Sequence, residues 1–127
     1  MGLHGCATTP VRLEEHGSWK LHTINDELLY GQRQITLHFD SASRFSGFSG
    51  CNHYRGEYRY EDGAIDVLDV VTTTDQRCES AIEEQEKQYL DIIGDAVNYH
   101  EQCDLLRLRT AEGDRMLFKR AVKSPVR

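Results

Sequence analysis

Cysteine and histidine are the residue types in this chain that could do chemistry, and its 127 residues include four cysteines and six histidines. Cys6, Cys51, Cys78 and Cys103 are far apart and form no C-x-x-C pair. This spacing disfavours a zinc knuckle or a thioredoxin-type redox motif. A disulfide and a reactive thiol both stay open as interpretations.

The sharpest catalytic hypothesis is a cysteine hydrolase with Cys51 as the nucleophile and His53 as its base. Residues two apart on a strand share a face, but the alternation of the sequence assigns His53 to the solvent face, beside Arg55 and Arg59. No third residue that could orient the histidine is identifiable. We therefore expect a core or bridged Cys51, no catalytic residue, and a protein that is not an enzyme.

A metal site could be built from histidines that strand faces bring together. No two of these histidines have a local ligand spacing such as i and i+4 on a helix. The acidic run at 79–84 is better explained by the start of a helix, whose dipole favours carboxylates there. We expect neither a metal nor another cofactor, and solvent-exposed histidines. The histidines concerned are His22, His38, His53 and His100.

The composition, with 39% apolar and 28% charged residues, is typical of one soluble globular domain. The net charge of -6 argues against a broad attraction to nucleic acid or to anionic lipid surfaces. The basic residues are interleaved with acids, so we interpret them as solvated strand faces rather than as a binding patch. They are Arg55, Arg59, Arg107, Arg109, Arg115, Lys119 and Arg120.

Period-two alternation predicts strands with one buried and one solvated face through most of the chain. In the clearest strand, Ile35, Leu37 and Phe39 alternate with polar residues. Asp62-Gly63 predicts a hairpin turn, because this pair supplies the positive φ angles of a tight reversal. The expected strands are 18–24, 34–40, 52–60, 64–71, 97–102, 105–110 and 115–120.

From Glu79 the period changes to that of a helix, which we expect to end at Gly94. Ser80 is expected as its N-cap, with Glu83 completing a capping box. The inner face is expected to carry Ile82, Gln85, Tyr89, Leu90, Ile92 and Ile93, and the outer face Glu83, Glu84, Glu86, Lys87 and Asp91.

Helix and strands are segregated along the chain, which favours the α+β class. We expect a curved, mainly antiparallel sheet of about eight strands that forms a partial barrel, with one α-helix packed across it, in the order βββββαβββ. The domain is expected to span 18–127, after a flexible N-terminal tail at 1–17.

A curved sheet with a helix across it could also hold an apolar cleft for a peptide, a lipid or another small molecule. Aromatic residues are the candidates to line such a cleft, although at these spacings they more often belong to the core. They are Trp19, Tyr54, Tyr58, Tyr60, Tyr89 and Tyr99.

One run of residues resembles a known family. The pattern Gly47-x-x-Gly50-Cys51-Asn52-x-Tyr54-x-Gly56-x-Tyr58, followed by Thr74-x-x-x-Cys78 and an amphipathic helix, is similar to the META domain of HslJ-type heat-inducible bacterial lipoproteins. The resemblance covers about residues 18–120. The motif residues also have structural uses: the glycines permit sharp bends, Asn52 can bind turn backbone groups, and the tyrosines pack on one strand face.

The resemblance implies a non-enzymatic protein of the bacterial envelope, in the periplasm or at the outer membrane. It implies a binding or supporting module linked to stress response, novobiocin resistance, or motility and secretion. In an exported protein a disulfide between Cys51 and Cys78 is the natural pairing, with two small buried thiols as the alternative. Cys103 would then be unpaired.

Leu3-His4-Gly5-Cys6 resembles the end of a lipoprotein signal peptide, in which the cysteine is acylated. The alternative is an incidental thiol in a tail. We accordingly expect contact with a membrane only through a lipid on Cys6, an unidentified protein or peptide partner in the envelope, and no binding of nucleic acid.

Overall fold

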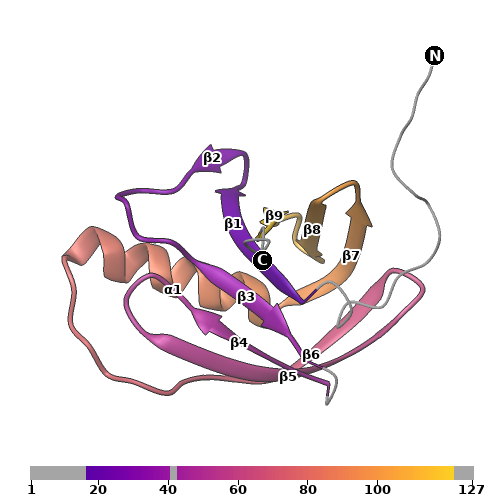
Figure 1. The fold of residues 1–127 in the computed structure, drawn as a ribbon, viewed down its shortest axis with the longest axis horizontal. Coiled ribbons are helices and arrows are strands. Elements are labelled where there is room, and N and C mark those ends of the chain that lie inside the picture. The colour runs from indigo at the N-terminus through magenta and orange to yellow at the C-terminus, as the bar shows by residue number, and fades with distance from the viewer. Residues whose placement is uncertain (1–16, 41–42, 122–127) are drawn as a thin grey trace, which may run out of the picture.

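The protein is described by a computed structural model that covers residues 17–40 and 43–121 (Figure 1). Within these residues the chain forms six strands, one helix and then three strands. The elements are β1 (Ser18–Ile24), β2 (Glu27–Leu28), β3 (Thr36–Phe39), β4 (Arg44–Phe48), β5 (His53–Glu61), β6 (Ala64–Thr72), α1 (Ser80–Gly94), β7 (Ala96–Gln102), β8 (Leu105–Thr110) and β9 (Arg115–Arg120). The predicted tail at 1–17 lies outside this part of the chain, except for Gly17.

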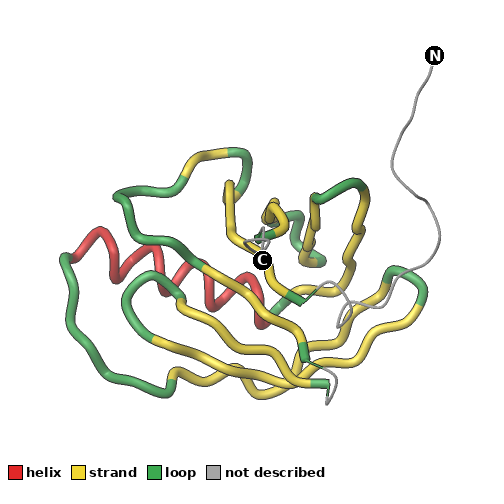
Figure 2. Tube along the Cα trace, viewed as in Figure 1, coloured by secondary structure: helices red, strands yellow, loops and turns green. Residues whose placement is uncertain are grey.

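The strands form one antiparallel sheet that closes on itself (Figure 2). Each strand pairs with the next along the order β1-β3-β4-β5-β6-β7-β8-β9, and β9 pairs back with β1, for example at Trp19 opposite Arg120. The expected partial barrel is therefore a closed eight-stranded barrel, with β2 as an extra strand beside β1. The closure is weakest between β6 and β7, which pair only at Ala64 opposite Asn98.

Two strands have no counterpart among the segments assigned from the sequence. β2 has only two residues, which is too short for an alternating pattern. β4 contains Gly47 and places both Gly47 and Phe48 at intermediate exposure, so its alternation is lost after Phe45. The sequence assigned residues to four strands before the helix, although the expected order has five, and the structure has six.

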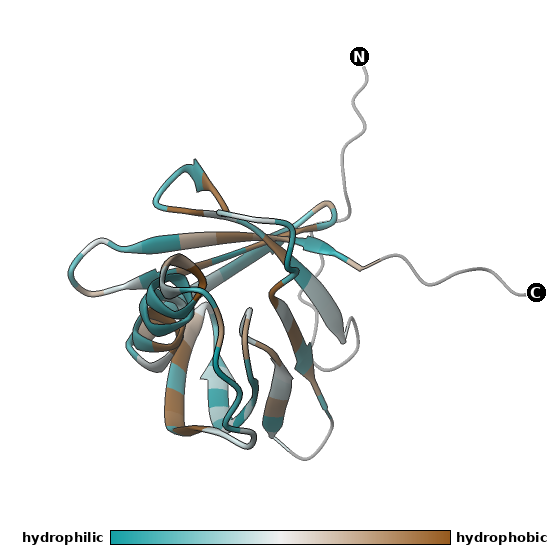
Figure 3. Cartoon of the chain, turned by 90° about the vertical axis from the view of Figure 1, so that its left-hand side faces the viewer, coloured by the Kyte–Doolittle hydropathy of each residue, from teal (hydrophilic) through white to brown (hydrophobic). Residues whose placement is uncertain are grey.

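The barrel interior is filled by the inward side chains of the strands and by one face of α1. Figure 3 shows hydrophilic and hydrophobic bands along the strands, as period-two alternation requires. The largest fully buried side chains include Trp19, Tyr54, Tyr58 and Tyr89. Tyr60 and Tyr99 are partly buried and pack against the same core. The aromatic candidates for a cleft thus belong to the core.

Helix α1 departs from its prediction at two places. Its N-cap is Glu79 rather than Ser80, and no side chain caps it. Glu83 instead accepts a hydrogen bond from the amide of Cys78 at 2.9 Å. This bond, followed by the guanidinium of Arg77, lowers the pKa of Glu83. The second departure is Glu86, which is buried rather than on the outer face.

No helix in the described ranges is long and apolar enough to span a membrane.

Candidate functional site

The family-like motif spans the end of β4, a tight turn and the first half of β5. We call residues 49–52 the motif loop. Its Ser49 amide donates to the carbonyl of Asn52 at 2.8 Å, and Gly50 has a φ of 108°. A positive φ is strained for residues with a Cβ, so this backbone conformation accounts for a glycine at position 50.

Two further glycines of the motif allow close approach between neighbouring segments. A Cβ on Gly47 would lie 2.1 Å from the carbonyl oxygen of Thr36. A Cβ on Gly56 would lie 2.5 Å from the ring of Phe45. Neither position has room for a side chain, which accounts for both glycines structurally.

The buried carboxylate of Glu86 holds the motif loop onto α1. Oε2 of Glu86 accepts hydrogen bonds from the Ser49 hydroxyl at 2.5 Å, the Asn52 amide at 2.7 Å and the Cys51 amide at 3.3 Å. Its Oε1 accepts a further bond from Nδ2 of Asn52 at 3.1 Å. Glu86 is only 8% exposed and forms no ion pair with any described residue. Its negative charge is therefore compensated by four neutral donors of one short loop.

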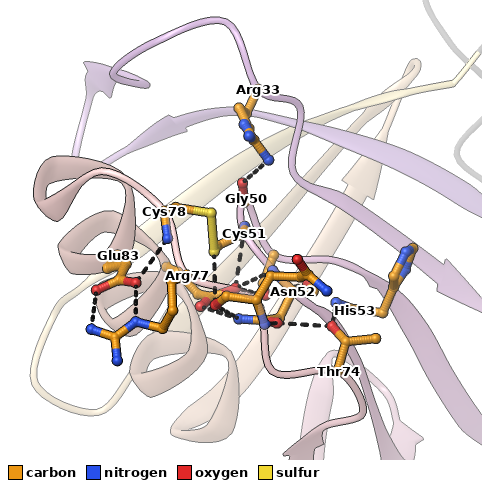
Figure 4. The surroundings of a disulfide bond; sticks show 12 residues. Arg33, Gly50, Cys51, Asn52, His53, Thr74, Arg77, Cys78 and Glu83 are labelled. Carbon is orange, nitrogen blue, oxygen red and sulfur yellow. Dashed lines mark hydrogen bonds and ion pairs between the residues drawn. A yellow bond between two sulfur atoms is a disulfide. The ribbon is translucent and has the colours of Figure 1, made fainter.

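The side chain of Asn52 extends this network to the segment between β6 and α1 (Figure 4). Its Oδ1 accepts hydrogen bonds from the Thr74 hydroxyl at 2.8 Å and from the Gln76 amide at 2.6 Å. Oγ1 of Thr74 in turn accepts a bond from the amide of His53 at 3.0 Å. Asn52 and Thr74, far apart in the sequence, thus join three segments at the start of α1.

A disulfide between Cys51 and Cys78 links the same segments covalently, so the bridge implied by the family resemblance is present. The two Cα atoms are 6.1 Å apart and the residues are separated by 27 positions. Because the sulfur of Cys51 is bonded to another sulfur, it has no thiolate and cannot be the nucleophile of a hydrolase. Cys103 is also disulfide-bonded, and the expectation that it is unpaired is wrong.

The two buried tyrosines beneath the motif form a hydroxyl pair. The hydroxyl of Tyr54 donates to the carbonyl oxygen of Thr36 at 2.6 Å and lies 2.5 Å from that of Tyr89. Burial raises the pKa of both tyrosines above the usual 10.0. Both side chains are therefore neutral at physiological pH and serve packing rather than acid–base chemistry. Tyr58, on the same face of β5, packs edge-on against Phe39 at 4.9 Å between ring centroids.

A hollow lies beside this network. We call residues 25–34, which join β1 to β3 and include β2, the flap; it bows out over the N-terminal half of α1 (Figure 1). Between the two is a groove of about 480 Å³, the flap groove. The flap lines it with Asn25, Glu27 and Leu28, and the helix lines it with Ala81, Glu84, Gln85 and Gln88, among others.

The contacts of Tyr30 and Arg33 fasten the flap. The amide of Tyr30 donates to Oε1 of Gln85 at 2.7 Å, and Nε2 of Gln85 donates back to the Tyr30 carbonyl at 3.2 Å. The Tyr30 hydroxyl donates to Glu79 at 2.7 Å, which raises the pKa of Tyr30. Arg33 reaches the carbonyl of Gly50 at 3.4 Å, so the flap also touches the motif loop.

The remaining candidates of the sequence do not converge on a site. His38, His53 and His100 are exposed, and His22 is partly exposed. The ring of His53 packs edge-on against Phe48. In the described ranges no three histidine, cysteine or acidic side chains lie close enough together to hold a metal ion. Cys6, the expected acylation site, lies outside the described residues.

Sequence reasoning missed Glu86, Ser49 and the flap. A signal for Glu86 existed: it lies four residues after Ile82 and three before Tyr89, on the apolar stripe of the helix. No comparable signal marks the flap, because its partners on α1 are more than 50 positions away.

Comparisons with known proteins bear on the whole chain. The family model described as "META domain" matches residues 11–123. A protein from Burkholderia xenovorans, solved by NMR, is 23% identical with a TM-score of 0.66, covering 96% of this chain and 97% of its own. A DUF4847 family protein from Bacteroides vulgatus is 10% identical with a TM-score of 0.64, covering 88% and 97% respectively. These two structures share the fold. No curated protein matches significantly.

Proposed function

The chain belongs to the META domain family, and from this premise we propose that it is a non-enzymatic protein of the bacterial cell envelope that binds a protein or peptide partner in the flap groove. One observation carries the proposal. The groove of about 480 Å³ lies next to Leu28 and Tyr30, whose side chains are 73% and 49% exposed. Exposed apolar side chains beside a concave surface are typical of a binding site.

The groove favours a partner segment that is extended and basic. β2 pairs only with β1, so its outer edge can accept another strand. Glu27 and Glu84 line the groove, and neither forms an ion pair with a described residue. A strand that carries lysine or arginine beside an apolar residue could pair with the edge of β2 and form ion pairs with Glu27 and Glu84.

The polar groups of the motif support a binding role over a catalytic one, because they are occupied by one another. Glu86, Asn52 and Thr74 bond within the network, and Cys51 is bridged. The motif on this view holds the helix and the groove in shape. The link to stress response, novobiocin resistance, or motility and secretion would then act through the bound partner.

The disulfides support a location in the periplasm or at the outer membrane. Cys51, Cys78 and Cys103 are all disulfide-bonded, and such bonds persist in oxidising compartments and are rare in the cytosol. Thiol counting by mass spectrometry tests the location and the anchor together. Protein from the native cell that shows free Cys51 or Cys78 before reduction would contradict an envelope location. Reduction of an acylated chain exposes one thiol fewer than reduction of a chain whose Cys6 carries no lipid.

Site-specific photo-crosslinking tests the partner. A crosslinking residue at Gln88, which lines the groove, should capture one discrete protein in native cells, whereas the same residue at Glu57 on the outer face of β5 should not. Binding of a peptide from the captured segment should weaken in Glu84→Lys and persist in Glu57→Lys. Equal capture at both positions, or none, would refute the groove as the binding site.

A further inference from the structure

Four cations gather on the outer face of the barrel. None of them lines the flap groove. Lys20 of β1, Lys119 of β9, and Arg107 and Arg109 of β8 are all exposed. We call these four residues the basic face. Their strands are neighbours in the barrel, because β8 pairs with β9 and β9 pairs with β1.

The strand register places these cations next to one another. Lys20 lies directly opposite Lys119, and Arg109 lies directly opposite Arg115. Lys119 also lies opposite Leu105, two residues along β8 from Arg107. Like charges at directly opposite positions destabilise a sheet, so the Lys20–Lys119 pair is unfavourable for the isolated fold.

Acids of the described residues lie near the basic face, but they pair with other cations. None of its four cations forms an ion pair with a described residue, while Arg115 is paired with Asp26 and Arg120 with Asp104. The acid of β7, Glu101, lies opposite the buried Leu106 and so belongs to the inner side of the sheet. The net charge of -6 therefore hides a local cationic surface.

We propose that the basic face docks the protein on a lipid surface that carries anionic phosphate headgroups. Exposed lysine and arginine side chains are attracted to such surfaces, and arginine binds phosphate oxygens through two parallel hydrogen bonds. An anionic headgroup between Lys20 and Lys119 would bind both ammonium groups and offset their mutual repulsion. This docking is independent of the flap groove and of any lipid on Cys6.

Apolar residues within the face favour a lipid surface over nucleic acid. Leu105 lies opposite Lys119, and Leu117 lies opposite Arg107. Cross-strand partners share a face, so two partly exposed leucines lie among the cations. Cations around exposed apolar side chains are typical of proteins that lie on a membrane interface.

Vesicle flotation with the full, non-acylated chain tests the proposal. The probes are vesicles of phosphatidylcholine alone, vesicles that also contain phosphatidylglycerol, and duplex DNA as a second polyanion. Wild-type protein should float with the anionic vesicles at about 20 mM salt and detach at about 0.5 M, because salt screens surface charges. It should not float with the neutral vesicles.

Two double variants with the same loss of charge separate the basic face from net charge. Lys119→Gln/Arg109→Gln should weaken vesicle partitioning about 25-fold, at about fivefold per charge. It removes the repulsive Lys20–Lys119 pair, so its thermal unfolding temperature should not fall. Arg55→Gln/Arg59→Gln on β5, where acids alternate with the arginines, should change partitioning by less than about twofold.

Three results would overturn the proposal. The first is wild-type flotation no greater with anionic than with neutral vesicles. The second is an equal loss of partitioning in the two double variants, which would indicate net charge alone. The third is binding of the DNA as tight as that of the anionic vesicles at the same salt, which would make the face a general polyanion surface.

Discussion

The motif loop and the flap both rest on the N-terminal half of α1, through consecutive residues of the helix. Glu86 holds the motif loop with a buried carboxylate that accepts four hydrogen bonds, and the Cys51–Cys78 disulfide reinforces the attachment. Gln85 holds the flap with two neutral hydrogen bonds near the surface. The same helix therefore holds the motif loop firmly and the flap weakly, through two neighbouring residues.

The difference follows from burial. When a buried acceptor is removed, its donors stay unsatisfied because water cannot reach them. When an exposed acceptor is removed, water takes its place, and the free energy of unfolding changes little. The motif loop should therefore open only when the whole fold unfolds, whereas the flap can open without global unfolding. The proposed partner site lies beside this segment.

The largest expected effect is that of Glu86→Ala. Removal of the carboxylate leaves the Ser49 hydroxyl, two backbone amides and the Asn52 amide group without their acceptor, at a cost of about 3–5 kcal/mol in the free energy of unfolding. Urea denaturation at neutral pH measures the loss. Glu84→Ala, an exposed glutamate two positions earlier, is the control and should change stability by less than about 0.5 kcal/mol. Similar losses in both variants would show that burial of the Glu86 carboxylate does not set its contribution to stability.

The disulfide comes next. The double variant Cys51→Ser/Cys78→Ser should lose about 3.5 kcal/mol, because a closed loop of this length restricts the unfolded chain. The variant is preferable to a reducing agent, since reduction also opens the disulfide of Cys103. Guanidinium denaturation gives the value. Unchanged stability would mean that the Glu86 network alone fixes the loop.

The tyrosine pair beneath the motif loop gives a pH-dependent effect. Burial holds the pKa of Tyr54 and Tyr89 above 10.0 in the folded state, so the unfolded chain releases these protons first. Their contribution is complete below pH 10 and declines as the pH rises above it. Tyr54→Phe should cost about 1–2 kcal/mol at pH 8 and flatten the decline of stability above pH 10. A decline as steep as that of wild type would contradict this role.

The smallest change in stability, and the sharpest contrast with Glu86, is expected for Gln85→Ala. Its loss should stay below about 1 kcal/mol, because both freed groups of Tyr30 can bind water. Hydrogen exchange should nevertheless show lost protection at the Tyr30 amide, whose hydrogen bond is accepted by Gln85. Gln88→Ala, which removes a groove glutamine without that contact, should leave the amide protected. Retained protection in Gln85→Ala would show that other contacts hold the flap.

The sequence predicted well what depends on neighbouring residues. β1, β8 and β9 have the expected bounds, and α1 ends at Gly94 as its period indicates. The two faces of β5 are also as expected, with Tyr54 and Tyr58 buried and Arg55 and Arg59 exposed. In each case alternation or the helical period carries the information locally.

What the sequence could not show depends on contacts between distant residues. The pairing of β1 with β9 closes the barrel, but no residue of either strand indicates its partner. Glu86 was assigned to the solvent because a charge inside an apolar stripe is costly unless donors surround it, and those donors come from residues 49–52. The basic face likewise exists only in the register between β1, β8 and β9.

The pairing of β1 with β9 also orders events in time. The ribosome synthesises β1 about a hundred residues before the strand that completes its edge. Until Arg115–Arg120 has been synthesised, this edge of β1 has no strand to pair with. The barrel can therefore close only late in synthesis, after its last strand is available.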